Sequence, residues 1–209
     1  MNDPNNLRRA LGAICREDFA DALADVLMTA RENDEIDYAA IARRAGERTQ
    51  DLLLFAWEEK LLIPRSSLRC AEWDDRMMVL APGQTYEMPN IARYLVTEAL
   101  RTGRWDPPRA IAALYRDMGA PDWGKMPELV RDLAREAVND TLRGTQIAAA
   151  CVRNGIRAST GAVIAILKGG GIISPKLAPM GPAGKARTPI YEFNPSIRPL
   201  HGRPGETTT

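Results

Sequence analysis

The sequence predicts a mainly α-helical protein with small β-hairpins. Two observations support this prediction. Apolar residues recur at helical spacing along most of the 209 residues, and short runs rich in β-branched and aromatic residues suit brief strands. Glycine, proline and asparagine interrupt these patterns where helices would end and turns begin. The composition, 45% hydrophobic and 26% charged, is typical of a globular chain with a true core.

The most complete pattern is a helix, a turn and a second helix near the C-terminus. Thr145 is a suitable N-cap for the first helix, and Asn-Gly at 154–155 tolerates the positive φ that would end it. Ser159 and Thr160 are suitable N-caps for the second helix, which the glycines at 169–171 would end. The expected apolar faces consist of Ile147, Cys151 and Val152 on the first helix and Val163, Ile166 and Leu167 on the second.

A hairpin is predicted directly after the second helix. Residues 172–174 and 189–193 suit short strands, and proline, glycine and lysine are frequent in the connection from Lys176 to Arg187. This order of elements, with Thr-Gln-Ile-Ala-Ala, Asn-Gly-Ile and Ser-Thr-Gly-Ala-Val-Ile along it, resembles the winged-helix proteins, a branch of the helix-turn-helix class found mostly in transcription regulators. The resemblance covers about the last third of the chain and implies that the second helix enters the major groove of DNA.

The charge distribution defines a candidate interface with double-stranded DNA. Residues 143–209 contain nine Lys or Arg and two Glu, a net charge of +7, and residues 1–142 contain 19 basic and 25 acidic residues, a net charge of −6. A basic module favours a polyanion because each cation that neutralises a phosphate releases condensed counterions. Arg157, Ser159 and Thr160 are expected to face the groove, and Arg153, Lys168, Lys176, Lys185 and Arg187 are expected to contact phosphates.

Residues 1–83 are predicted to form a second, more degenerate unit of the same kind. One long helix is expected over residues 7–31, followed by a short helix that Asp37 caps and Gly46 ends, and then by a further helix. Residues 68–81 are expected to form the hairpin of this unit. The alternative is an all-α domain with one exposed hairpin.

Acidic side chains are frequent around the second helix and the expected hairpin of this N-terminal unit. They would repel phosphates. We therefore expect the unit to bind another protein or a second copy of the chain. The residues concerned are Glu47, Asp51, Glu58, Glu59, Asp74 and Asp75.

Residues 84–125 are predicted to form a helical connector, a hairpin of two helices whose second helix starts at Pro107. A helix over residues 128–142 is expected to open the C-terminal winged-helix domain, which spans residues 126–197. Residues 198–209 lack apolar periodicity and are expected to form a flexible tail. The predicted fold is therefore mainly α with small β-hairpin wings, in which tandem winged-helix-like units are joined by a helical hairpin.

Catalytic and metal sites are not expected. The only histidine, His201, lies in the expected tail, and the cysteines Cys15, Cys70 and Cys151 are widely spaced and suit buried, reduced positions. Neighbouring carboxylates on a helix do not converge on one point. We therefore expect no enzyme activity and no cofactor. Because no apolar run reaches the length of a membrane span and the start lacks an apolar signal region, a cytoplasmic protein without membrane contact is expected.

Two functions remain open at this stage. The first is a DNA-binding transcription regulator that uses the basic C-terminal winged helix. The second is a winged-helix module that binds other proteins and no nucleic acid, since Gly161, Ala162 and Ala165 would also permit close packing against a protein partner. The tryptophans do not separate these alternatives: Trp57 is expected in the core, and Trp105 and Trp123 are expected to cover it.

Overall fold

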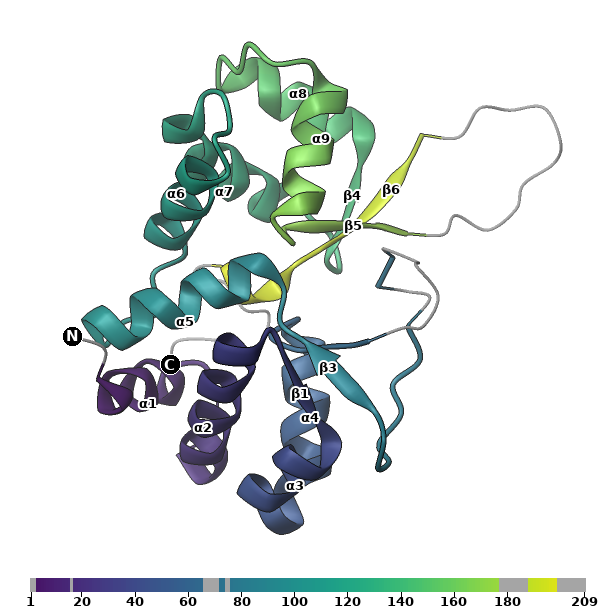
Figure 1. The fold of residues 1–209 in the computed structure, drawn as a ribbon. Coiled ribbons are helices and arrows are strands. Elements are labelled where there is room, and N and C mark those ends of the chain that lie inside the picture. Colours follow the sequence, from purple (N-terminus) through teal and green to yellow (C-terminus); the bar gives the residue numbers. More distant parts are fainter. Residues whose placement is uncertain (1–2, 16, 66–71, 74–75, 177–187, 199–209) are drawn as a thin grey trace, which may run out of the picture.

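The computed structural model describes residues 3–15, 17–65, 72–73, 76–176 and 188–198, and all structural statements below concern these residues. Within them the chain is mainly helical and forms two small antiparallel sheets, which confirms the coarse prediction. One sheet lies in the N-terminal half (residues 3–88) and the other in the C-terminal half (residues 126–198). Helices α5 (Asn90–Thr102) and α6 (Pro107–Asp117) join the halves (Figure 1).

The region predicted as one helix over residues 7–31 forms two helices, α1 (Pro4–Gly12) and α2 (Glu17–Asn33), so this prediction was wrong. The error arose because apolar positions continue at helical spacing on both sides of the break. Nε of Arg8 on α1 lies 3.2 Å from a carboxylate oxygen of Asp21 on α2, a contact that requires α2 to fold back along α1. The break lets both helices bury their apolar faces in one core.

The N-terminal sheet has the strand order β1-β3-β2, with two helices between its first and second strands in sequence. Its elements are β1 (Glu35–Asp37), α3 (Tyr38–Ala45), the short 3-10 helix η1 (Gly46–Arg48), α4 (Thr49–Glu58), β2 (Ile63–Pro64) and β3 (Thr85–Glu87). As predicted, the Asp37 side chain caps α3 by accepting a hydrogen bond from the Ala40 N–H, at 2.7 Å, and Gly46 follows α3 with positive φ.

The N-terminal hairpin does not lie at residues 68–81, where the sequence predicted it. Residues 77–81 are not a strand, and residues 68–71 and 74–75 lie outside the described part. The pairing instead centres on Tyr86, which is fully buried between Ile36 of β1 and Pro64 of β2. The Tyr86 hydroxyl donates a hydrogen bond to the Val79 carbonyl (2.6 Å), so the segment predicted as a strand serves as a hydrogen-bond acceptor beside the sheet.

The two helices predicted for the connector are present as α5 and α6, but the predicted start at residue 84 is wrong, because Thr85–Glu87 form β3 of the N-terminal sheet. Gly103 ends α5 in the left-handed conformation, and the Asp106 side chain caps α6 by accepting a hydrogen bond from the Arg109 N–H (3.1 Å). Pro107 occupies the first turn of α6, where the missing N–H costs nothing. A 3-10 helix, η2 (Trp123–Lys125), leads into the C-terminal half.

The C-terminal sheet has the strand order β4-β6-β5, with two helices between its first and second strands in sequence. The elements of this half are α7 (Met126–Glu136), β4 (Thr141–Arg143), α8 (Gly144–Arg153), α9 (Thr160–Gly169), β5 (Ile173–Lys176), β6 (Ile190–Phe193) and the 3-10 helix η3 (Pro195–Ile197). The predicted pairing of a strand after Gly171 with a strand near Phe193 is confirmed.

The helix predicted over residues 128–142 ends earlier, and Leu142 lies in β4. Asn139 and Asp140 both adopt positive φ, 48° and 53°, between the paired residues Val138 and Thr141. Asn and Asp tolerate this conformation better than other residues with a Cβ. The Asn-Asp pair therefore makes a tight turn that the apolar periodicity concealed.

Two details of α8 were also predicted wrongly. Thr145 is not its cap, because the helix begins at Gly144 and Arg143 takes the cap position. The Gln146 side chain accepts a hydrogen bond from the Arg143 N–H (2.7 Å). Val152 is 80% exposed, whereas Ile147 and Cys151 are buried as expected. Five residues advance a helix by about 140° beyond one full turn, so Val152 points away from the face that holds Ile147.

The second helix of this pair follows its prediction more closely. The Ser159 hydroxyl caps α9 by accepting a hydrogen bond from the Ala162 N–H (3.3 Å). Val163 and Leu167 are buried, but Ile166 is only partly buried against the core. Gly171 has positive φ in the turn that follows α9, as the run of glycines predicts.

The tryptophans and cysteines agree with the sequence in part. Trp105 is buried, but Trp123 is 45% exposed and does not cover the core, and Trp57 is only partly buried. Cys151 is buried and Cys15 is partly buried. The predictions for Cys70, His201 and the end of the tail concern residues outside the described part.

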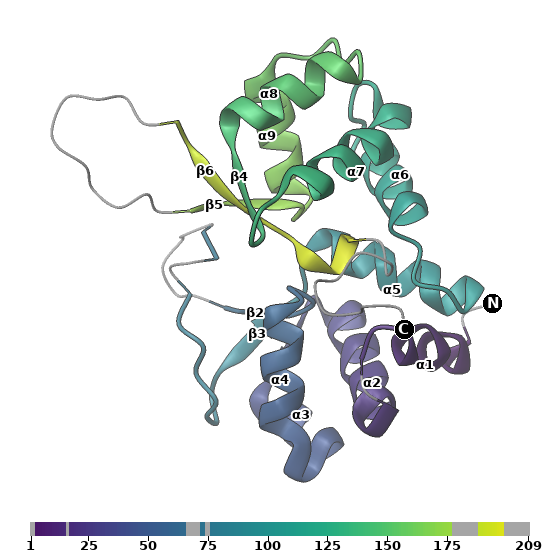
Figure 2. The same ribbon diagram turned by 180° about the vertical axis from the view of Figure 1, so that it is seen from behind.

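The two halves are held together by contacts between distant segments. Nζ of Lys60, just after α4, lies 2.9 Å from a carboxylate oxygen of Glu192 on β6, and both side chains are largely buried. The Trp105 indole N–H donates a hydrogen bond to the Ser196 carbonyl (2.9 Å), which holds η3 beside the end of α5. Figure 2 shows β6 and η3, in yellow, running from the C-terminal sheet towards α5. One hydrophobic cluster extends through both halves.

Candidate nucleic-acid interface

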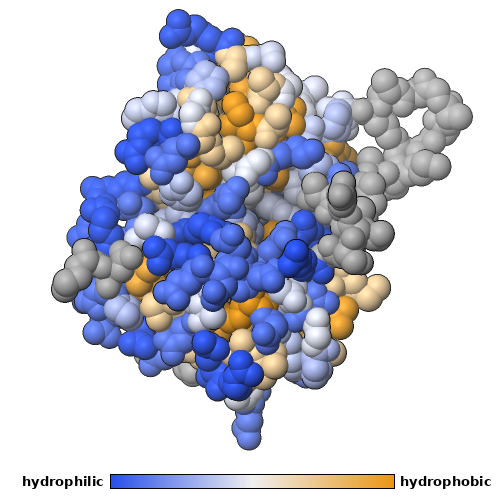
Figure 3. Space-filling model, viewed as in Figure 1, coloured by the Kyte–Doolittle hydropathy of each residue, from blue (hydrophilic) through white to orange (hydrophobic). Residues whose placement is uncertain are grey.

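The outward face of α9, the helix predicted to enter a DNA groove, carries small side chains. Gly161, Ala162 and Ala165 are exposed on it, and Lys168 is exposed near its end. Figure 3 shows apolar residues gathered over this part of the molecule. The middle of α9 therefore offers close approach and little hydrogen bonding, and its polar groups lie at its two ends.

The first end of α9 presents Arg157 and Ser159. The Arg157 side chain is 88% exposed, and its Nε lies 3.9 Å from Asp122. Its backbone N–H donates a hydrogen bond to the Asp122 carboxylate (3.0 Å), and this bond is the main reason why the pKa of Asp122 is lowered. The Ser159 hydroxyl is engaged in the cap, and Thr160, the first residue of α9, is half-buried. Arg157 is thus the long polar side chain that extends from this end.

Two lysines lie at and beyond the other end of α9. Lys168 in its last turn and Lys176 at the end of β5 are both exposed. Neither forms an ion pair with any residue that the structure describes. Their full charge is therefore presented to solvent, as a phosphate contact requires.

The remaining predicted phosphate contacts differ in their surroundings. Arg153 forms an ion pair with Glu136 of α7, so a phosphate would have to compete with that carboxylate. Lys185 and Arg187 lie outside the described residues. The sequence from Arg143 to Lys176 contains no Asp or Glu, so this segment, which forms β4, α8, α9 and β5, adds no negative charge of its own.

The corresponding surface in the N-terminal half is different. The exposed side of α4 carries Gln50, Asp51 and Glu58, together with Leu54. Arg48 lies 3.3 Å from Asp51, so part of its positive charge is compensated. This helix presents carboxylates where α9 presents alanines, and it is unsuited to a phosphate backbone.

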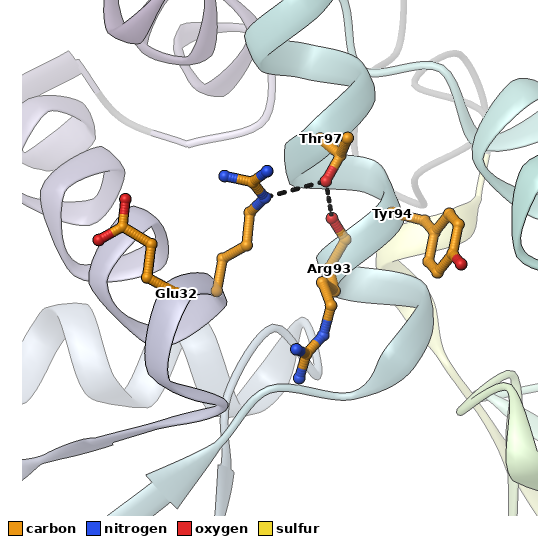
Figure 4. A pocket seen from close by; sticks show the side chains of 5 residues that line it. Glu32, Arg93, Tyr94 and Thr97 are labelled. Atoms are coloured by element: carbon orange, nitrogen blue, oxygen red, sulfur yellow. Dashed lines mark hydrogen bonds between the residues drawn. The ribbon is translucent and has the colours of Figure 1, made fainter. Parts of the chain in front are cut away.

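A second, polar groove lies between α2 and α5 (Figure 4). Arg31 donates from Nε to the Thr97 hydroxyl (3.0 Å), which itself donates to the Arg93 carbonyl (2.8 Å). Arg93 forms an ion pair with Asp34, and the Tyr94 hydroxyl donates a hydrogen bond to Asp117 on α6. These contacts join neighbouring elements and account for most of the polar groups in the groove.

No group of three or more His, Cys, Asp or Glu side chains that could hold a metal ion occurs among the described residues. In the same part of the chain, no helix has both the length and the apolar character that a membrane span requires.

A protein-family model matches residues 5–203, and the chain belongs to that family, whose description states no activity, ligand or partner. The match covers both halves and the connector together. No curated protein and no solved structure matches the chain.

Proposed function

We propose that this protein binds double-stranded DNA in the manner of a transcription regulator, through a winged helix formed by its C-terminal half. The observation that carries the proposal is the segment from Arg143 to Lys176, which is free of carboxylates and has Arg157, Lys168 and Lys176 exposed around α9. In this arrangement α9 lies in the major groove, and the cations at its ends contact the phosphates on either side.

We further propose that the N-terminal half is a second winged-helix unit. The order helix, strand, helix, helix, strand, strand occurs in both halves, and the third strand is central in both sheets. The central strands also correspond in register. Tyr86 pairs with Ile36 and Pro64, and Tyr191 pairs with Leu142 and Pro175. This register supports tandem units whose surfaces serve different partners, with the acidic N-terminal unit binding a protein or a second copy of the chain.

A salt titration with the full chain tests the DNA proposal. Affinity for a 20-base-pair duplex is measured by fluorescence anisotropy between about 50 and 200 mM salt, where log K should fall linearly with log salt concentration. Replacing Lys168 and Lys176 together with Gln should weaken binding to all duplexes alike and reduce the slope by up to about two. Arg116→Gln, an exposed change on α6, is the matched control and should leave the slope unchanged.

Contacts to bases and to phosphates can be distinguished in the same assay. Replacing Arg157 with Ala should change the preference among duplex sequences by about 1–3 kcal/mol if its side chain reads a base. Replacing Lys185 and Arg187 should weaken binding to all duplexes alike, as expected for Lys168 and Lys176, without changing the preference among sequences. Absence of duplex binding at about 50 mM salt would contradict the proposal.

A second function is favoured by a different observation. The alanines of α9 and Val152 of α8 are exposed, and such small or apolar side chains suit packing against another protein. Under this alternative the C-terminal half is a protein-interaction module, and the DNA titration is negative. Sedimentation velocity over a hundredfold range of concentration would reveal self-association, which Val152→Asp should weaken if Val152 lies in the contact.

A further inference from the structure

A pocket of about 260 Å³ lies where the connector meets the C-terminal half. Its lining comes from the α5–α6 turn, the first two turns of α6 and α7, and η3. The buried residues Trp105, Ile111, Val130 and Ile197 contribute apolar walls, and prolines at 107, 108 and 127 complete them. A mostly apolar cavity with a few convergent polar groups is the usual form of a small-molecule site, although this one is slightly smaller than the common range of about 300–1,000 Å³.

The walls of the pocket are held by contacts that do not involve its interior. The Trp105 indole N–H is bonded to the Ser196 carbonyl, which fixes the ring. The prolines at 107 and 127 lie in the first turns of α6 and α7, where their rings fit the helix start. A rigid proline ring cannot rotate into the space beside it as a branched side chain could. The pocket is therefore formed before any ligand arrives.

The charged groups at the pocket leave one uncompensated cation. Both carboxylate oxygens of Asp106 are engaged by Arg109, one by its N–H (3.1 Å) and one by its guanidinium (3.3 Å). Arg131 forms an ion pair with Glu128. Arg104 is exposed, and its guanidinium has no hydrogen bond or ion pair with any residue in the described part of the chain. The pocket thus combines apolar walls with one available guanidinium.

We propose that this pocket binds a small organic carboxylate, with its apolar body against Trp105 and Val130 and its carboxylate paired with Arg104. A guanidinium fork matches carboxylate geometry, and the walls exclude a ligand that is polar throughout. The groove between α2 and α5 shows the contrast, because its Arg93 is already paired and its Arg31 is bonded to Thr97 (Figure 4). This site is separate from α9, so the inference does not depend on DNA binding.

Three probes separate the features of the proposed ligand. Phenylacetate has the apolar body and the charge, phenylacetamide has the body without the charge, and acetate has the charge without the body. Each is titrated into the full-length, ¹⁵N-labelled protein, and the indole N–H signal of Trp105, assigned with Trp105→Phe, is followed. Trp123 lies outside the pocket and provides the control signal. Phenylacetate should shift the Trp105 signal with a Kd of about 1–10 mM, as expected for a ligand of this size.

The charge requirement is tested with Arg104→Gln, an exposed change that should not affect folding. It should weaken phenylacetate binding about two- to fivefold, the range for an exposed ion pair, and leave phenylacetamide binding unchanged. Arg116→Gln at the other end of α6 should change neither. The proposal is overturned if phenylacetate does not shift the Trp105 signal, if acetate shifts it equally well, or if Arg104→Gln has no effect on phenylacetate or weakens both aromatic probes equally.

Discussion

The two halves of the molecule share an order of elements and a strand register but differ in the surfaces they expose. In the turn after the second helix, Lys60 of the N-terminal half and Gly171 of the C-terminal half both have positive φ. The central strands align Tyr86 with Tyr191 and therefore Glu87 with Glu192. The buried residues and the turns therefore maintain the common order of elements, whereas the outward faces of α4 and α9 differ.

The equivalent glutamates show how the halves were adapted to each other. Glu87 forms an ion pair with Arg76 in its own half, whereas Glu192 pairs with Lys60 of the other half. Nζ of Lys60 also lies 3.8 Å from the centre of the Trp57 ring, a cation–π contact. Lys60 remains at a left-handed position that Gly171 occupies in the other half, at some cost in backbone energy. The ion pair between the halves therefore uses Lys60 at a position whose backbone would suit glycine better.

The largest effect on stability is expected from breaking the ion pair between Lys60 and Glu192. Replacing Lys60 with Met or Glu192 with Gln leaves one charge buried without its partner, since the exposed fractions of the two side chains are 8% and 16%. Each change should lower the free energy of unfolding by about 3–5 kcal/mol, and the double variant should lose less than the sum of the two. Urea denaturation of the four proteins measures this.

The exposed pair between Arg65 and Glu35 serves as the matched control for that experiment. It joins the residue after β2 to β1 within one half, and both side chains are well exposed. Its removal should cost at most about 1 kcal/mol. If the Lys60 variants lose no more unfolding free energy than the Arg65 variants, the Lys60–Glu192 ion pair does not hold the halves together.

The next effect is a loss of stability at high pH from the central tyrosine of the N-terminal sheet. Burial raises the pKa of Tyr86 to about 12. Its neutral form therefore stabilises the fold fully below pH 10, the pKa in the unfolded chain, and the contribution disappears as the pH rises from 10 to 12. Two pKa units correspond to about 2.7 kcal/mol.

Denaturation of the wild type and of Tyr86→Phe at pH 9 and at pH 11.5 isolates this contribution from other groups that titrate at high pH. The wild type should lose more stability than the variant between the two values. Equal losses would show that the tyrosine is free to ionise in the folded protein.

The elements that the sequence identified correctly are those whose signals are local. Asp37, Ser159 and Pro107 each act on backbone groups within one helical turn, so their roles follow from sequence spacing. The strands β1 and β4 escaped notice because each has three residues and pairs with a strand about 50 positions away. Their existence depends on tertiary pairing, which one-dimensional periodicity does not contain.

The candidate interface was predictable to a similar extent. Lys168 and Lys176 are exposed as expected, but the pairing of Arg153 with Glu136 could not be foreseen. Its two partners lie on different helices, and only the fold brings them together. The pocket beside Arg104 has no sequence signal at all, because its walls come from segments that extend over about 90 residues.

A smaller effect on stability is expected at the end of α9. The residue before the left-handed position is Gly170 in the C-terminal half and Glu59 in the N-terminal half. A Cβ at Gly170 would lie 2.7 Å from the hydroxyl oxygen of Tyr115, a buried tyrosine whose hydroxyl has no hydrogen-bond partner among the described residues. The backbone of Gly170 suits alanine, so the cost of Gly170→Ala comes from the crowded contacts of the new methyl group and should be about 1–3 kcal/mol.

Tyr115→Phe should stabilise the protein or leave it unchanged, since it removes an unpaired buried hydroxyl. Combined with Gly170→Ala it should recover part of the lost stability, but not all of it, because Leu114 would still lie 3.2 Å from the new methyl group. Melting temperatures of the single and double variants provide the comparison. A double variant as unstable as Gly170→Ala would show that the hydroxyl contributes nothing to the cost, which would then come from the remaining contacts with the Tyr115 ring and Leu114.

The smallest effect on stability is expected from replacing Arg157. Because the fold should keep its stability, a change in DNA binding by this variant can be attributed to the proposed interface. The low pKa of Asp122 comes first from the Arg157 backbone N–H, which Arg157→Ala retains. The stabilisation that this carboxylate provides is present above its unfolded pKa of about 3.8 and is lost as the pH falls through its lower folded value. Arg157→Ala should therefore keep both the wild-type midpoint at pH 7 and its acid dependence, whereas Asp122→Asn should weaken the protein at pH 7 and approach the wild type in acid. If the stability of Arg157→Ala is unchanged while its DNA preference shifts, the shift comes from a lost contact with DNA; if its stability also falls, Arg157 has a structural role and the binding data must be reinterpreted.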